Sequence, residues 1–170
     1  MALYERFGEF DSVEELNATA EGLKAEGDLE SLKALAVENG LEEADAEDYM
    51  DDIVPELANS LLAAQGKIRV ESRALEISGI LADWKDTIIE ECMEDKQFCA
   101  AVRKRNKSLR KCMSLLIQFS FENKVRVNDK IISITTVKHN GKMEPLKGPL
   151  YLGIPSRVET RKIIRDYYLG

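Results

Sequence analysis

The densest group of side chains suited to chemistry is a run of cations at residues 103–111. Six Lys and Arg residues fall within these nine positions, and Ser108 among them is a residue type typical of a helix N-cap. A helix that begins there points its free backbone amides, and the positive end of its dipole, at the same place as the cations. This combination binds phosphate groups. The segment therefore predicts a nucleic-acid contact made by Arg103, Lys104, Arg105, Lys107, Arg110 and Lys111.

The first part of the chain carries the opposite charge. Residues 1–95 have 26 acidic and 7 basic side chains, whereas residues 96–170 have 5 acidic and 17 basic ones. Acidic helices can imitate the backbone of a nucleic acid and occupy the basic groove of a protein that normally holds one. The two halves can equally pair with each other inside the fold, and the sequence leaves both alternatives open. The acidic residues that we select for a partner contact are Glu42, Glu43, Glu47, Asp48, Asp51 and Asp52.

Enzymatic chemistry finds little support in the sequence. The single histidine, His139, lies in the turn-like sequence His139–Lys142, and no glycine-rich phosphate-binding loop is present. The three cysteines have no metal-ligand spacing, so we expect free thiols in the interior or on helix faces. We predict a protein that is not an enzyme and has no cofactor or bound metal. The weakest alternative is a metal-dependent nuclease that uses carboxylates on one helix, at Asp83, Asp86, Glu90 and Glu91.

The apolar runs of the chain are short. None approaches the roughly 20 residues that a membrane-spanning helix needs. The first residues also lack the basic and apolar segments of a secretory signal. We therefore expect a cytoplasmic protein that does not contact a membrane.

Capping residues and helical periodicity define the elements that must position these side chains. We expect a mainly α (α+β) fold, with an acidic helical module at residues 1–54 and a main domain at 55–170. Ile80, Trp84 and Ile88 form an apolar stripe that is either core or a dimer contact, and the oligomeric state stays open. The predicted helices cover residues 12–24, 28–39, 43–52, 55–66, 78–93, 95–105 and 108–123.

The character of the chain changes near residue 130. Residues 67–70 and 130–137 predict extended segments, and Asn140–Gly141 predicts a tight turn. We therefore expect a small antiparallel β-element within residues 130–154. Ser156 and Glu159 form a capping box for a closing C-terminal helix at residues 157–169.

Three segments of the second half resemble a known group of proteins. Residues 95–98, 107–113 and 163–168 look like PcfK-like proteins, which are small proteins carried by conjugative plasmids and other mobile elements of Gram-positive bacteria. The whole chain, with its acidic first part, is also similar to small accessory proteins of phages and integrated elements of Firmicutes. Some members of these groups are anti-CRISPR proteins that inhibit the type II effector nuclease.

The resemblance implies a non-enzymatic inhibitor that binds a type II CRISPR effector, or its complex with guide RNA, and blocks DNA engagement or cleavage. The alternative is a DNA-binding accessory protein of a conjugative or phage element, for which DNA or RNA is the partner.

Overall fold

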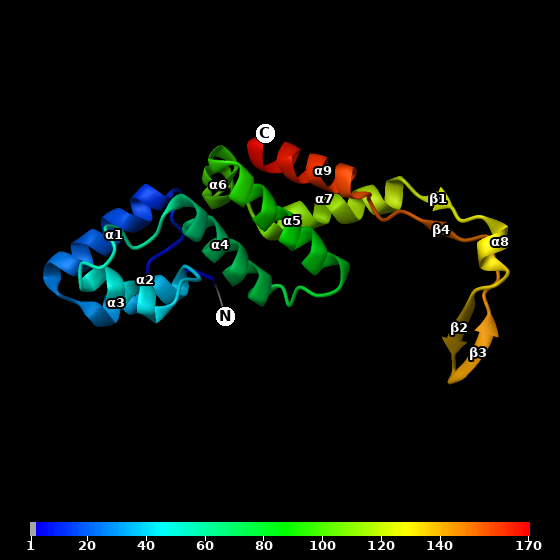
Figure 1. Cartoon of the computed structure of the whole chain (residues 1–170), viewed down its shortest axis with the longest axis horizontal. Coiled ribbons are helices and arrows are strands. Elements are labelled where there is room, and N and C mark those ends of the chain that lie inside the picture. The colour runs from blue at the N-terminus through cyan, green and yellow to red at the C-terminus, as the bar shows by residue number, and fades with distance from the viewer. Residues whose placement is uncertain (1–2) are drawn as a thin grey trace.

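The computed structural model describes residues 3–170, so the first two residues of the predicted acidic module lie outside it. The molecule is elongated, with a helical body and an arm of short strands at one end (Figure 1). The expected mainly helical fold, with small antiparallel strand pairs and a closing C-terminal helix, is confirmed. Within the described residues the elements are α1 (Val13–Glu26), α2 (Leu29–Glu38), α3 (Glu43–Met50), α4 (Ser60–Ala74), α5 (Ile80–Glu94), α6 (Lys96–Arg103), α7 (Leu109–Glu122), β1 (Val125–Arg126), α8 (Asp129–Ile132), β2 (Thr136–His139), β3 (Lys142–Pro145), β4 (Tyr151–Leu152) and α9 (Arg157–Leu169).

Side-chain caps set the ends of most helices. The Ser12 side chain accepts a hydrogen bond from the backbone of α1, and Asp28, Asp95 and Ser108 do the same for α2, α6 and α7. Ser156 and Glu159 form the predicted capping box of α9. The helix ends that depend on local sequence therefore lie within a few residues of their predicted positions.

Two hydrophobic cores fill the body, and α4 contributes to both. The first core packs α1–α3 around Leu16, Leu32 and Leu35, and it includes Ala63 of α4. The next residue, Ala64, belongs to the second core, which packs α4–α7 and α9. Because one continuous helix joins the two cores, the acidic helices are attached through packing rather than through a flexible linker.

The prediction that a helix ends at Gly66 and is followed by an extended segment is wrong. Helix α4 continues through Gly66 to Ala74. The lack of a side chain at Gly66 serves a close approach, because a Cβ there would lie 2.2 Å from the Asn39 carbonyl oxygen. Gly40 faces the same contact from the other side and has a φ of +75°. Two glycines thus allow the α2–α3 connection to pack directly against α4.

The arm, residues 124–155, differs partly from its prediction. Residues 129–132 form the short helix α8 where a strand was expected, and the strand begins only at Thr136. The predicted turn is confirmed, since Asn140 and Gly141 both have positive φ and join β2 to β3. A second antiparallel pair, β1 with β4, forms the base of the arm.

Candidate functional site

All six acidic residues selected from the sequence are exposed on or beside α3. Four of them have cationic neighbours in the same chain: Lys33 lies near Glu43 and Glu47, Lys24 near Asp52, and Arg69 near Glu42. Within residues 3–170, Asp48 and Asp51 have no ion pair. The structure therefore brings the six residues to one surface, but only two of them are free of intramolecular partners.

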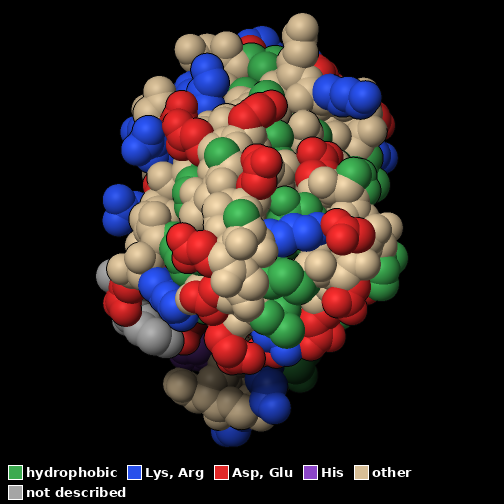
Figure 2. All heavy atoms as spheres, turned by 90° about the vertical axis from the view of Figure 1, so that its left-hand side faces the viewer, with side chains coloured by type: hydrophobic (Ala, Val, Ile, Leu, Met, Phe, Trp, Pro, Cys, Tyr) green, Lys and Arg blue, Asp and Glu red, His purple; other side chains and the backbone are tan. Residues whose placement is uncertain are grey.

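Further carboxylates enlarge this acidic surface. Glu14, Glu21 and Glu26 of α1 are exposed, and the described part of the chain offers them no cation within 4.0 Å. Seen end-on, Asp and Glu side chains lie across the whole face made by α1–α3, while most Lys and Arg side chains lie toward its edge (Figure 2). Residues 1–60 hold 18 acidic and 3 basic side chains, so this end of the molecule keeps a strong negative field.

The basic segment is only partly available to a partner. Arg103 is 2% exposed, and its Nη2 donates a hydrogen bond to Asn39 Oδ1 at 2.7 Å. It lies inside the contact between the two cores and is therefore not part of a surface. The local sequence gives no sign that Arg103 is buried, because its partner Asn39 is 64 positions away along the chain.

Two more cations of the segment have intramolecular partners. The backbone amide of Arg105 donates to Asp11 Oδ1 at 2.9 Å, and its guanidinium lies within 4 Å of the Asp11 and Glu15 carboxylates. Lys107 Nζ donates to the Tyr167 carbonyl at 2.7 Å. Lys104, Arg110 and Lys111 are exposed and form no ion pair within residues 3–170. These three are the remaining candidates for a phosphate contact.

A buried ionic cluster that the sequence did not reveal fixes the geometry of this basic segment. Lys67 of α4 donates to the carbonyls of Lys104 and Lys107, at 2.6 and 2.8 Å, and lies 2.6 Å from Glu9 Oε1. One turn later, Glu71 accepts a hydrogen bond from the Leu109 amide at the start of α7. The positive charge of Lys67, at carbonyls that follow α6, matches the negative C-terminal end of the α6 dipole. The carboxylate of Glu71, at the first amide of α7, matches the positive N-terminal end of the α7 dipole.

Burial changes the acidity of one member of this cluster. The loss of solvent around Glu71 raises the pKa of its carboxyl group above the ordinary 4.5, although the Leu109 amide and the charge of Lys67 act in the opposite direction. Because the Leu109 amide donates its hydrogen bond to Glu71, the first amide of α7 is already occupied. This reduces the capacity of the α7 N-terminus to bind an external phosphate.

The cations of α9 are also neutralised within the chain. Arg165 donates to Glu91 and Asp95, Arg161 pairs with Glu91 and Glu94, and Arg157 lies 3.4 Å from Glu90. Helices α5 and α9 are therefore joined by a row of opposite charges.

This pairing affects the carboxylates that we considered for a nuclease. Glu90 and Glu91 are held by arginines, and Asp86 lies 2.7 Å from Lys85. Among residues 3–170, no group of three or more His, Cys, Asp and Glu side chains has an arrangement that could hold a metal ion. The four residues share a helix but do not converge on one point that is free of cations.

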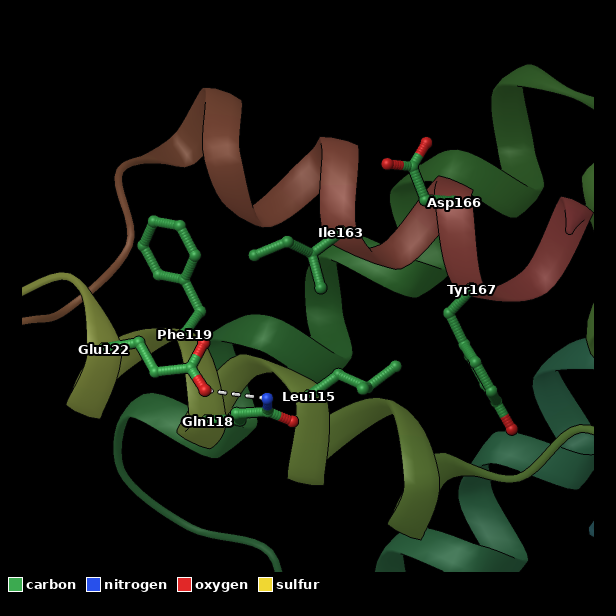
Figure 3. A pocket seen from close by; sticks show the side chains of 7 residues that line it. All are labelled: Leu115, Gln118, Phe119, Glu122, Ile163, Asp166 and Tyr167. Atoms are coloured by element: carbon green, nitrogen blue, oxygen red, sulfur yellow. Dashed lines mark hydrogen bonds between the residues drawn. The ribbon is translucent and has the colours of Figure 1, made fainter.

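A groove of about 380 Å³ lies between α7 and α9. Leu115, Phe119, Ile163 and Tyr167 line it (Figure 3). At its rim, Gln118 donates to Glu122 at 2.8 Å. Its two carboxylates are each held by a neighbour, Glu122 by Gln118 and Asp166 by Lys162, so the apolar side chains supply most of its contact surface.

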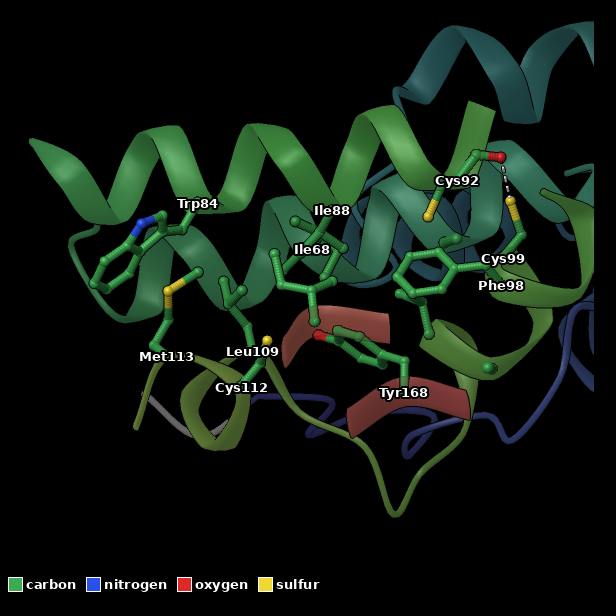
Figure 4. Packing of buried hydrophobic residues seen from close by; sticks show 14 of the residues in the cluster. Ile68, Trp84, Ile88, Cys92, Phe98, Cys99, Leu109, Cys112, Met113 and Tyr168 are labelled. Atoms are coloured by element: carbon green, nitrogen blue, oxygen red, sulfur yellow. Dashed lines mark hydrogen bonds between the residues drawn. The ribbon is translucent and has the colours of Figure 1, made fainter. Parts of the chain in front are cut away.

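The cysteines are free thiols in the second core, as predicted. Cys99 donates a hydrogen bond to the Cys92 carbonyl at 2.8 Å (Figure 4). Burial raises the pKa of all three thiols, that of Cys112 to about 12, so they stay protonated and unreactive at neutral pH. His139 lies far from them in the arm and is exposed beside Glu144. The structure therefore brings no thiol and imidazole together.

Comparison of the chain with protein-family models, with curated proteins and with solved structures found no match. Among the described residues, no helix has both the length and the apolar character required to cross a membrane. Two charged surfaces of the described chain are therefore candidates for binding a partner: a broad acidic face on α1–α3 and a smaller group of unpaired cations near the start of α7.

Proposed function

We propose that this chain is a non-enzymatic inhibitor of a type II CRISPR effector nuclease. In this proposal the acidic face of α1–α3 binds the basic channel that normally holds the guide–target heteroduplex. The effector, or its complex with guide RNA, then cannot engage or cleave DNA. The choice of effector follows the resemblance of residues 95–98, 107–113 and 163–168 to PcfK-like proteins.

The observation that carries the proposal is the concentration of carboxylates at one end of the molecule, where residues 1–60 hold 18 acidic side chains and only 3 basic ones. The cations of the second half are more dispersed: some, such as Arg105, Arg161 and Arg165, pair with carboxylates of the same chain, and the others are spread over the start of α7 and the arm. Asp48 and Asp51, together with Glu14, Glu21 and Glu26 of α1, have no such pairs within the described chain. Because exposed unpaired charge steers association with an opposite surface, this concentration of carboxylates gives the acidic face a strong capacity to bind a basic partner.

The helices that present this face also give it a fixed shape. Leu16, Ala20 and Leu32 are fully buried beneath it, so α1 and α2 form a packed unit. An ordered row of carboxylates loses less conformational entropy on binding than a disordered acidic tail. The packing therefore supports a surface that docks into the basic groove of a protein that normally holds nucleic acid.

The alternative is a DNA-binding accessory protein of a conjugative or phage element. The observation in its favour is that Lys104, Arg110 and Lys111 are exposed and have no ion pair among residues 3–170. This alternative predicts direct binding to DNA that weakens steeply with salt. Replacement of these three residues by glutamine would then weaken binding to every sequence alike and lower the salt dependence.

A gel-shift experiment separates the two functions. Purified protein is mixed with duplex DNA, single-stranded DNA and guide RNA, each with and without a type II effector. If the chain is the inhibitor, we expect it not to shift nucleic acid alone and to abolish the shift of DNA by the effector. A salt-sensitive shift of bare DNA, together with an unchanged effector shift, would support the accessory protein instead.

A further inference from the structure

The arm has too little interior to be stable by itself. In residues 124–155, all of which the structure describes, Ile132 is the one large aliphatic side chain that is buried. Isolated two-stranded hairpins are marginally stable in water. Seven large apolar side chains of the arm are more than half exposed, namely Val125, Ile131, Ile134, Met143, Tyr151, Leu152 and Ile154. Apolar surface on this scale marks a contact with another macromolecule.

The chemistry of the arm favours a protein partner that is acidic. Aliphatic side chains such as Ile134 and Met143 need an apolar surface to cover them, which a phosphate backbone does not provide. The arm also carries six Lys and Arg residues and only two acidic residues, Asp129 and Glu144. A complementary surface therefore combines apolar side chains with carboxylates.

The chain itself has such a surface at its other end. A groove of about 230 Å³ lies where α3 connects to α4. Val54, Pro55 and Leu62 supply apolar lining, and Asp45, Asp48 and Glu56 supply carboxylates. Arm and groove lie at opposite ends of the elongated molecule (Figure 1), so an arm reaches this groove only in another chain.

We propose that two copies of this chain form an antiparallel dimer in which the arm of each packs into the α3–α4 groove of the other. A two-fold axis makes the two contacts identical and closes the assembly. The opposite charges of the two ends favour the antiparallel over the parallel arrangement. The dimer covers Asp48, so it competes with binding of a partner to the acidic face.

The test is sedimentation velocity on the full chain over a concentration series. An arm variant, Ile134→Ser with Met143→Ser, and a groove variant, Asp48→Lys with Glu56→Lys, each change exposed side chains only. The matched control is Met93→Ser, a 61% exposed residue of α5 outside both surfaces. Circular dichroism establishes that all three variants are folded.

We expect a dimer for the wild-type chain and the control, and a monomer for each of the two variants. An equal mixture of the two variants should form a heterodimer, because the arm of one and the groove of the other are intact. A monomeric wild-type chain at every concentration would overturn the proposal. A groove variant that dimerises like wild type, or a mixture without heterodimer, would also contradict the reciprocal contact.

Discussion

Arg103 and Asn39 form a hydrogen bond of 2.7 Å between two buried side chains that lie 64 residues apart. The arginine belongs to the basic segment, and the asparagine ends α2 in the acidic part. This bond joins the two halves at the place where Gly40 and Gly66 bring their backbones together. A residue selected from the sequence for nucleic-acid binding is thus part of the interior.

The bond makes Asn39 a sensitive position. Asn39→Ala leaves the buried Arg103 guanidinium without this acceptor, so we expect the free energy of unfolding to fall by roughly 2–3 kcal/mol. The exposed Arg110→Ala should change it by less than about 0.5 kcal/mol. Urea unfolding of both variants measures the difference. Equal stability of Asn39→Ala and wild type would show that the contact does not hold the halves together.

The two glycines of the same junction allow a paired comparison. Gly66→Ala places a Cβ 2.2 Å from the Asn39 carbonyl oxygen, and the resulting overpacking should cost about 1–3 kcal/mol. Gly22 is an exposed position of α1 where an added Cβ has no neighbouring atom within 4 Å. Gly22→Ala should therefore stabilise the chain by up to about 1 kcal/mol. Thermal unfolding of the two variants should show shifts of opposite sign. A stabilising Gly66→Ala would exclude the close approach.

The buried carboxyl group of Glu71 predicts a dependence of stability on pH. Its pKa is raised in the folded state, so between 4.5 and that higher value the folded chain binds more protons than the unfolded chain. The contribution of Glu71 to the free energy of unfolding is therefore greatest at or below pH 4.5 and decreases as the pH rises through this window.

Glu71→Gln is the variant that isolates this contribution, because it keeps an acceptor for the Leu109 amide and removes the titration. Urea unfolding at a series of pH values should show the stability of wild type declining relative to this variant above pH 4.5. A constant difference between the two proteins across the series would mean that Glu71 does not titrate with a raised pKa.

Local signals in the sequence predict much of the fold. Ser108, Asp95 and the Ser156–Glu159 box set helix ends through bonds within a few residues, so their effect is visible in the sequence. The course of α4 through Gly66 depends instead on a contact with Asn39. No pattern inside α4 indicates that contact, so the local sequence predicts a helix end at the glycine.

The candidate surfaces also combine features that the sequence predicts with features that depend on contacts between distant residues. The acidic face follows directly from composition, because charged side chains on amphipathic helices remain at the surface. Which cations stay free depends on distant partners, such as Asp11 for Arg105 and Tyr167 for Lys107. The pairing of β1 with β4 closes a segment of about 25 residues and likewise has no local signature.

Reversing the charge of the acidic face tests the proposed inhibition directly. Asp48→Lys with Asp51→Lys reverses two exposed carboxylates of this face that have no ion pair in the described chain. Glu76→Lys with Asp83→Lys is the control, since it makes the same change in net charge at two exposed residues outside α1–α3 that likewise have no ion pair within residues 3–170. The measurement is the concentration of each protein that abolishes DNA binding by a type II effector.

We expect the first variant to need a concentration roughly tenfold higher or more, because like charges across an interface cost several kcal/mol. The control should inhibit like wild type. Undiminished inhibition by folded Asp48→Lys, Asp51→Lys protein would contradict the claim that the acidic face occupies the effector's channel.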